Sequence, residues 1–320
     1  IEIFDFYHSV EDEKSGNPYN SFFTVRVKSG LFSGEGGWEI DYKAFNNCSS
    51  LTKITIPATV ATIGHDAFSG CKALTTVSFT LSLLPALTKV DYNAFLNCEK
   101  LTAISLPASV KTIGKYAFSG CKSLTSFNVP LATSSIAEGV FAGCDKLSKL
   151  TVSALNASFF ADGNCIIGND GKLVAGCNAS QIPIDGSVTS IGKAAFEGCT
   201  FTQVALPDSL ISVASGAFNK CLSLTDVYYL DTAEKWSGVT VATNNAALTG
   251  DKLHFLLCGD ADWNGKVDAD DLTQLAKYVA KMDEVPYYGV PAADVTHDEK
   301  VDSDDLTMMA KYVAKIISSF

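Results

Sequence analysis

Residues 113–130 read IGKYAFSGCKSLTSFNVP, and this order of residues recurs along most of the chain. Each copy has a phenylalanine, a cysteine three residues later, and a short β-rich run that ends near a proline. The spacings between these phenylalanines are 23, 27, 23, 23, 55 and 22 residues. A unit of that length cannot bury its own apolar face, so successive units must stack into a solenoid. The motif comprises Phe45, Phe68, Phe95, Phe118, Phe141, Phe196 and Phe218 with Cys48, Cys71, Cys98, Cys121, Cys144, Cys199 and Cys221.

Alternation within each unit predicts which side chains face the core. In LTKITIP, LTAISLP and FTQVALP the apolar residues stand at every second position of the β-rich run. The residues between them should line an exposed sheet that binds a protein or glycan, or that is merely a solvated face. This row comprises Lys53, Thr55, Thr76, Ser78, Ala103, Ser105, Ser126, Asn128, Lys149, Thr151, Gln203, Ala205, Asp226 and Tyr228.

The recurring Ala-Phe-x-x-Cys and Ile-Gly pairs resemble the BspA-type leucine-rich repeat, over residues 40 to about 242. The resemblance implies a mainly β leucine-rich-repeat solenoid over residues 41–258, of a kind found in bacterial surface or secreted adhesion and binding proteins. Residues 159–183 resemble its hairpin-containing units, and residues 227–239 its terminal unit, in which Trp236 covers the last coil. Residues 1–40 are expected to form an N-terminal β cap, with an independent small β domain as the alternative.

The seven motif cysteines occupy one position of the repeat, so stacking should align them as a ladder of buried free thiols. Cys165 and Cys177 flank the expected hairpin and are the one plausible disulfide pair.

A second pattern closes the sequence. Residues 260–271 read DADWNGKVDADD, and residues 294–305 read DVTHDEKVDSDD. Oxygen-bearing side chains at positions 1, 3, 5, 9 and 12 of a twelve-residue loop suit a hard cation that takes six to eight oxygen ligands. Each loop runs into helix-like text, DDLTQLAKYVAK or DDLTMMAKYVAK. The pattern predicts two calcium ions.

Paired loops that are each followed by one helix resemble a dockerin, here over residues 259–320. The resemblance implies a small all-α module with two EF-hand-like loops, which binds a cohesin domain of a scaffoldin. It implies ligation by Asp260, Asp262, Asn264, the Lys266 carbonyl, Asp268 and Asp271, and by Asp294, Thr296, Asp298, the Lys300 carbonyl, Asp302 and Asp305. The second loop should bind calcium more weakly, because Thr296 offers a neutral oxygen and Glu299 replaces the turn glycine.

The same resemblance implies which side chains contact the cohesin. They are Ala269, Asp270, Lys277, Tyr278 and Lys281 in the first half, and Ser303, Asp304, Lys311, Tyr312 and Lys315 in the second. We expect Asp270, Lys277 and Lys281 to share one helix face, while Leu272, Leu275 and Val279 (Leu306, Met309 and Val313 in the second helix) face the core. Four of the five positions are identical between halves, which allows docking in two orientations or reflects duplication with one half in use.

Composition narrows the function. The net charge is −11 and there is a single arginine, so no basic stripe for nucleic acid exists. No apolar run reaches the length of a membrane span, and the start at Ile1 suggests a processed or trimmed chain. Four scattered histidines and the absence of nucleophile or phosphate-binding motifs argue against catalysis.

The sequence thus predicts a secreted, non-catalytic cellulosome component. The dockerin would anchor it to a scaffoldin, and the repeats would bind a protein, a carbohydrate or a cell surface. The alternative is an enzyme or enzyme inhibitor carried on the repeats and delivered by the same module. No linker separates the two parts, so the dockerin should sit close against the solenoid.

Overall fold

The computed structural model describes residues 38–285 and 289–319. Apart from residues 38–40, the N-terminal cap expected over residues 1–40 lies outside the described residues. The strands in the first half of the repeats are β1 (Trp38–Ile40), β2 (Lys53–Ile56), β3 (Val60–Ile63), β4 (Thr76–Phe79), β5 (Lys89–Val90), β6 (Ala103–Ile104), β7 (Thr112–Ile113), β8 (Ser126–Val129), β9 (Ser135–Ile136) and β10 (Lys149–Val152). Those that follow are β11 (Phe159–Asp162), β12 (Cys165–Gly168), β13 (Lys172–Ala175), β14 (Ser190–Ile191), β15 (Gln203–Leu206), β16 (Ser212–Val213), β17 (Asp226–Tyr229), β18 (Thr240–Val241) and β19 (Leu253–Phe255).

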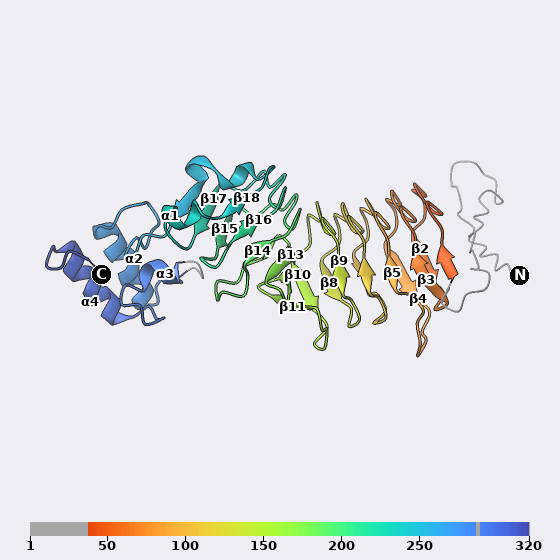
Figure 1. Ribbon diagram of the computed structural model, residues 1–320, viewed down its shortest axis with the longest axis horizontal. Coiled ribbons are helices and arrows are strands. Elements are labelled where there is room, and N and C mark those ends of the chain that lie inside the picture. Colours follow the sequence, from red (N-terminus) through yellow and green to blue (C-terminus); the bar gives the residue numbers. More distant parts are fainter. Residues whose placement is uncertain (1–37, 286–288, 320) are drawn as a thin grey trace, which may run out of the picture.

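The helices gather at the carboxyl end of the molecule (Figure 1). They are α1 (Ala233–Trp236), α2 (Ala269–Val279), α3 (Val290–Ala293) and α4 (Ser303–Val313), with short 3-10 turns at Ala246–Leu248 and Gly250–Lys252. None of the described helices has both the length and the apolar content that a bilayer crossing requires.

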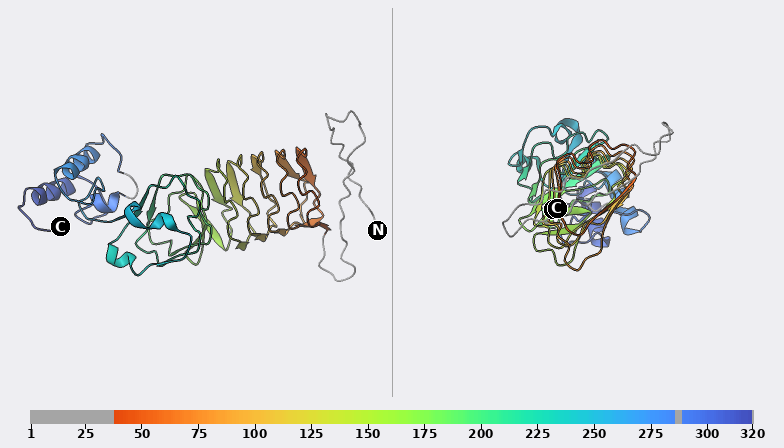
Figure 2. Two further views of the ribbon diagram at one scale, coloured as in Figure 1. Left: turned by 90° about the horizontal axis from the view of Figure 1, so that it is seen from above. Right: turned by 90° about the vertical axis from the view of Figure 1, so that its right-hand side faces the viewer.

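The strands stack as the coils of an elongated solenoid (Figures 1 and 2). One side carries the parallel orders β2-β4-β6, β8-β10 and β15-β17-β19, and another carries β1-β3-β5-β7-β9. Parallel pairs stay in register from coil to coil, as where Thr76–Phe79 lies beside Lys53–Ile56. The predicted β solenoid is confirmed, and stacking is what pairs each coil's backbone and buries its apolar face.

The motif phenylalanines form the spine of the core. Phe68, Phe95 and Phe118 are fully buried, and their rings stack in near-parallel pairs with centroids 5.1 and 5.4 Å apart. Phe45 and Phe141 extend the stack at its two ends. A central phenylalanine is therefore covered on both faces by the same residue of the neighbouring coils.

The motif cysteines form a second ladder beside the first. Five of the seven thiols donate to the carbonyl of the motif phenylalanine one coil earlier, as Cys71 does to Phe45 at 3.0 Å and Cys144 to Phe118 at 3.2 Å. Burial raises the pKa of both thiols to about 12. All ten cysteines are free, so Cys165 and Cys177, the one pair that the sequence left plausible, do not form a disulfide.

The geometry of the hairpin explains that error. Both thiols are buried, but they point to different backbone carbonyls: Cys165 Sγ lies 3.6 Å from the Gly163 carbonyl and Cys177 Sγ 3.7 Å from the Asn164 carbonyl. The two cysteines therefore flank one hairpin without forming a disulfide.

We expect the native protein to react slowly with a polar thiol reagent, because desolvation disfavours the reactive thiolate. After denaturation, most of the cysteines should titrate as free thiols. A thiol count made with and without denaturant checks both statements. Recovery of few or no thiols from the denatured, unreduced protein would contradict the ladder.

The 55-residue gap contains the expected hairpin. Strands β11, β12 and β13 run antiparallel in succession, and β13 then pairs in parallel with β14. Here the phenylalanine stack is interrupted, since the backbone at Gly176 lies against the ring of Phe196. A Cβ at Gly176 would stand 1.9 Å from Phe196 Cε1, so only glycine fits there. The solenoid consequently has two apolar clusters, one on each side of this unit.

The 27-residue unit has an equally local cause. Its extra residues form a loop between Thr80 and Ala86, whose backbone N–H groups still bond to the previous coil at Ile56 and Ala58. The loop carries three almost fully exposed leucines, Leu81, Leu83 and Leu84. The insertion thus leaves the register of the coils unchanged.

The carboxyl end of the solenoid meets the helical module directly. Trp236 packs on Tyr229 with ring centroids 4.9 Å apart, as expected for a residue covering the last coil, and β19 adds one more strand beside β17. Three residues after β19, Cys258 already packs against the core of the helical module. The prediction of close contact is confirmed.

Candidate calcium and docking site

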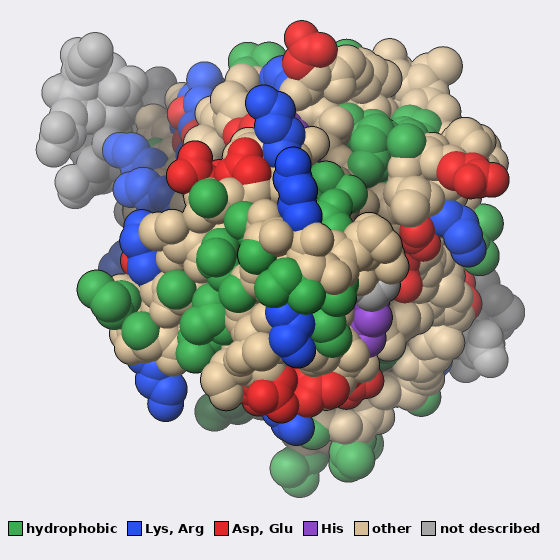
Figure 3. Space-filling model, turned by 90° about the vertical axis from the view of Figure 1, so that its left-hand side faces the viewer, with side chains coloured by type: hydrophobic (Ala, Val, Ile, Leu, Met, Phe, Trp, Pro, Cys, Tyr) green, Lys and Arg blue, Asp and Glu red, His purple; other side chains and the backbone are tan. Residues whose placement is uncertain are grey.

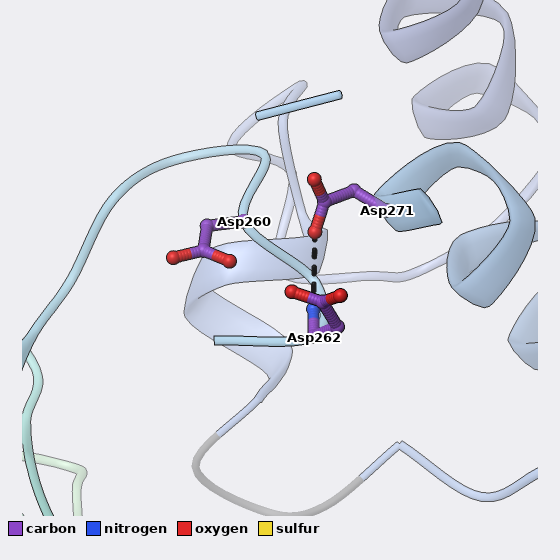
Figure 4. A group of neighbouring side chains, drawn as sticks. All are labelled: Asp260, Asp262 and Asp271. Carbon is purple, nitrogen blue, oxygen red and sulfur yellow. Dashed lines mark hydrogen bonds between the residues drawn. The ribbon is translucent and has the colours of Figure 1, made fainter. Parts of the chain in front are cut away.

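The first loop brings together carboxylates that are distant in sequence. Oxygen atoms of Asp260, Asp262 and Asp271 all lie within 4.8 Å of one another (Figure 4). Asp260 opens the loop, and Asp271 comes from the first turn of α2. Asp271 accepts the backbone N–H groups of Asp262 at 3.1 Å and Asp268 at 2.8 Å, so the helix start fixes its orientation.

This cluster is electrostatically unsatisfied by the protein alone. Asp260 is 2% exposed and Asp271 is fully buried. Burial raises the pKa of Asp260 to about 6, and N–H donation from Gly265 and Asn264 only partly offsets this. Burial likewise raises the pKa of Asp271. Converging buried carboxylates with no neighbouring basic group in the described chain are a donor set for a hard cation.

The second loop repeats the arrangement with one change. Carboxylate oxygens of Asp294, Asp298 and Asp305 lie within 4.8 Å of one another. Thr296 stands where the first loop has Asp262, and its hydroxyl donates to Asp305 at 3.0 Å. Glu299 adopts φ +66°, against +85° for Gly265 at the same loop position. Both expected departures are therefore present in the geometry, and left-handed backbone costs a non-glycine residue about 1–2 kcal/mol.

The other predicted ligands lie around these two clusters. Asn264 donates its side-chain amide to Asp262 at 2.9 Å and accepts the Lys266 N–H at 3.0 Å. Asp268 and Asp302 instead cap α2 and α4, where each accepts the N–H two residues ahead. Position 9 of such loops often reaches calcium through a water molecule, which agrees with this placement. Lys266 and Lys300 lie exposed in their loops and would offer only their carbonyls.

The two helices are built alike from their N-caps onward. Both have capping boxes, formed by Asp268 with Asp271 and by Asp302 with Asp305. Leu275 and Met309 are fully buried between the halves, and Leu272, Val279, Leu306 and Val313 pack around them. The predicted core face of each helix is confirmed. Asp271 and Asp305 each belong both to a carboxylate cluster and to the capping box of the following helix. Ordering of each loop is therefore coupled to formation of its helix.

The residues expected to contact a cohesin are accessible, with one correction. Ala269, Asp270, Lys277, Ser303, Asp304 and Lys311 are exposed, and Tyr278 and Tyr312 are half-buried. Lys281 and Lys315 do not lie on the helices, because α2 and α4 end at Val279 and Val313. Lys281 has φ +55°, and the Met282 N–H bonds to the Lys277 carbonyl, so the chain turns away from the helix in a Schellman arrangement.

Residues from the two halves meet at a shared hollow of about 870 Å³. Ala269 at the start of α2 lines it together with Tyr312 in the last turn of α4 and Lys315 just beyond that helix. From the sequence we expected each half to form a separate surface. The packing of α2 against α4 instead brings loop position 10 of the first half (Ala269) close to positions 19 and 22 of the second half (Tyr312 and Lys315). The end of the molecule seen in Figure 3 shows apolar side chains beside lysines and carboxylates, a mixture that suits a protein interface.

An aromatic contact joins the first loop to the solenoid, and sequence reasoning missed it. Trp263, at loop position 4, meets the ring of Tyr228 edge to face with centroids 4.9 Å apart. Tyr228 also stacks on His254, which pairs with Asp226 at 2.9 Å. The signal available in the sequence was a tryptophan at loop position 4, which is not one of the predicted ligand positions.

This contact alters part of the exposed sheet row. Ala205, expected to face solvent, is fully buried, and Tyr228 is half-buried. Ala205 pairs in register with Tyr228 on the neighbouring strand, so its methyl group stands beside a much larger side chain. In the first coils the row is exposed as expected, and Thr55 and Ser78 bridge neighbouring coils through their hydroxyls at 2.9 Å.

Two family models match the chain. The one described as BspA type leucine rich repeat region matches six copies over residues 38–165 and 171–239. The one described as dockerin type I domain matches residues 258–314. No curated protein matches the chain.

Solved bacterial leucine-rich repeat proteins resemble it more distantly. The T. pallidum leucine rich repeat protein is 26% identical with a TM-score of 0.40, over 59% of this chain and 72% of that one. A leucine-rich repeat protein from Eubacterium ventriosum is 22% identical with a TM-score of 0.49, and the match covers 63% of this chain and 58% of that one. A leucine rich cell surface protein from Faecalibacterium prausnitzii is 21% identical with a TM-score of 0.41, over 73% and 80% of the two chains.

Proposed function

Because this chain belongs to the BspA-type leucine-rich repeat family and carries a type I dockerin domain, we propose that it is a secreted, non-catalytic component of a cellulosome. Leucine-rich repeats and dockerins are both interaction modules. The dockerin would bind two calcium ions and plug into a cohesin of a scaffoldin. The repeats would hold a second partner, so that the chain connects this partner to the enzyme assembly.

The observation that carries the proposal is the pair of carboxylate clusters, each tied to the first turn of its own helix. Calcium would be bound by Asp260, Asp262, Asn264, Asp268, Asp271 and the Lys266 carbonyl, and by the equivalent atoms of the second loop. Once both loops are ordered, α2 and α4 start at fixed points and pack through Leu275 and Met309. The cohesin surface would exist only in that state.

Both halves should be able to dock. Four of five contact positions are identical, and the hollow lined by Ala269, Tyr312 and Lys315 supports a docking face that draws on both halves. A half-turn of the module would then present nearly the same side chains to the cohesin.

Alanine variants test this dual mode. Changing Lys277 and Tyr278 together, or Lys311 and Tyr312 together, should weaken binding to the cognate cohesin only slightly, because the intact half still docks. Changing all four should weaken binding by about thirtyfold or more, as expected when hot-spot residues are lost from every available interface. Surface plasmon resonance would measure the affinities, with a calcium titration of each variant as the folding control. Collapse of binding in either double variant would rule out dual docking.

A further inference from the structure

The irregular unit leaves a hollow in the wall of the solenoid. Strand β9 ends one sheet and β13 belongs to the next, with no ladder pairing between them. The hollow between them measures about 390 Å³, within the range of small-ligand sites. Its lining includes Ile136, Val174, Gly192 and four charged side chains.

Those four charges are three lysines and one carboxylate, Lys115, Lys172, Lys193 and Glu138. Lys115 and Lys193 each pair with one oxygen of Glu138, the second at 3.0 Å. Lys172 has no acidic side chain within ion-pair distance in the described chain. The lining therefore carries two net positive charges in a chain whose net charge is −11. Such a local reversal of sign favours an anionic ligand.

The existing contacts indicate which anion. Partial burial pushes the pKa of Glu138 upward, but its bonds with Lys115 and Lys193 outweigh burial and hold the pKa below its usual range. Lys115 and Lys193 are thus already spaced to bind the two oxygens of a carboxylate. A ligand carboxylate would bind Lys172 and compete with Glu138 for Lys193.

The same edge of the solenoid supplies aromatic rings beside the hollow. On the three preceding coils, the position of Lys115 in the repeat is occupied by Tyr42, His65 and Tyr92. These residues are aligned by backbone hydrogen bonds in which the N–H groups of Lys43, Asp66 and Asn93 donate to the carbonyls of His65, Tyr92 and Lys115. The ring centroids are 5.2 and 4.6 Å apart, and Tyr42 is 56% exposed. Successive coils lie about 4.7–4.9 Å apart, so the row offers a ring or a charge at each step.

We propose that this edge binds an acidic glycan, with a uronate carboxylate in the lysine-lined hollow and neighbouring sugar rings along Tyr92, His65 and Tyr42. Pyranose rings present C–H faces that pack on aromatic rings, whereas an acidic peptide would use the lysines alone. The proposal names a ligand class and a place for the binding role suggested for the repeats, and it does not depend on the calcium module.

Titration calorimetry of the full chain in calcium buffer tests it, with trigalacturonate as the probe. A neutral galactose trimer and a capped triglutamate peptide serve as the other two ligands. We expect trigalacturonate to bind more tightly than both, with an affinity that falls as salt is added.

Charge variants sharpen the test. Lys172→Gln should weaken binding by about two- to fivefold, the size expected for one exposed ion pair. Glu138→Gln should strengthen it by a similar factor, because the competing carboxylate is gone. Lys235→Gln removes the same charge from an exposed lysine of α1, which does not line the hollow, and should change nothing. Thermal melting of each variant confirms folding.

Three outcomes would overturn the site: no binding of trigalacturonate, equal binding of the neutral trimer or the peptide, or an effect of Lys172→Gln no larger than that of Lys235→Gln. Cohesin capture by the same preparation separates such a failure from a failure of the proposed docking function.

Discussion

Removing calcium is expected to unfold the dockerin while the solenoid stays folded. Residues 259–320 carry thirteen acidic side chains against six lysines, and Asp260, Asp271, Asp294 and Asp305 are buried. The apolar core of this module is small, with Leu275, Met309 and a few neighbours fully covered. Without the cation, converging carboxylates repel one another and leave the first turns of both helices unsupported. Calcium at about a thousand times its Kd contributes about 4 kcal/mol, comparable to the whole stability of a domain of this size.

Circular dichroism at stepwise calcium concentrations would follow the transition. The helical signal should disappear in EDTA and return with calcium, while the β signal remains. Asp260→Ala should abolish the first site, whereas Asp283→Ala removes an exposed carboxylate of the same module and should leave calcium binding unchanged. The first loop should bind more tightly than the second, because Thr296 is neutral and Glu299 holds a left-handed backbone. A module that stays folded with Asp260→Ala in both EDTA and calcium would contradict the coupling.

Replacing Phe118 with alanine is expected to destabilise the solenoid by about 3–5 kcal/mol. Phe118 is fully buried, with Phe95 and Phe141 stacked on its two faces and Phe127 tilted against it at 5.1 Å. Coils held by backbone ladders cannot collapse to fill the space, so the cavity remains and its cost adds to the lost apolar burial. Urea denaturation in calcium would measure the change in the free energy of unfolding.

Ser126→Ala is the matched control, because Ser126 lies on the exposed side of β8, one residue from the buried Phe127. It should change the free energy of unfolding by less than about 0.5 kcal/mol. An effect of Phe118→Ala as small as that of Ser126→Ala would mean that the stacked phenylalanines do not form the core.

The sequence could predict the features that repeat. Seven phenylalanines and seven cysteines at one repeat position implied two ladders, since each coil sets the position of the next. The loop carboxylates were equally predictable, because a twelve-residue loop that closes on its helix brings its first and last positions together. Glu299 occupies the loop position at which the first loop has glycine, so the sequence predicted an unfavourable backbone conformation there. The φ of Glu299 is left-handed, as that prediction requires.

What the sequence could not predict depends on contacts between non-equivalent units. Tyr228 is half-buried because its ring meets His254 and Trp263, and no repeat pattern contains that meeting. Lys281 lies outside the helix because α2 ends at Val279 and Lys281 itself adopts the left-handed conformation that terminates it, with no glycine in the sequence to indicate the end.

The hollow between β9 and β13 was hidden for the same reason. It exists because the hairpin unit interrupts the ladder, and its lysines come from three coils whose residues are far apart in sequence.

Capture by cohesins would show whether the dockerin binds its expected partner in a calcium-dependent way. A panel of cohesins that bind type I dockerins would be immobilised, and the full chain passed over them in calcium and then in EDTA. We expect at least one cohesin to capture the chain in calcium and to release it when calcium is removed. The variant that combines Asp260→Ala with Asp294→Ala should not be captured. Absence of capture by every cohesin, or capture that persists unchanged in EDTA, would contradict this expectation.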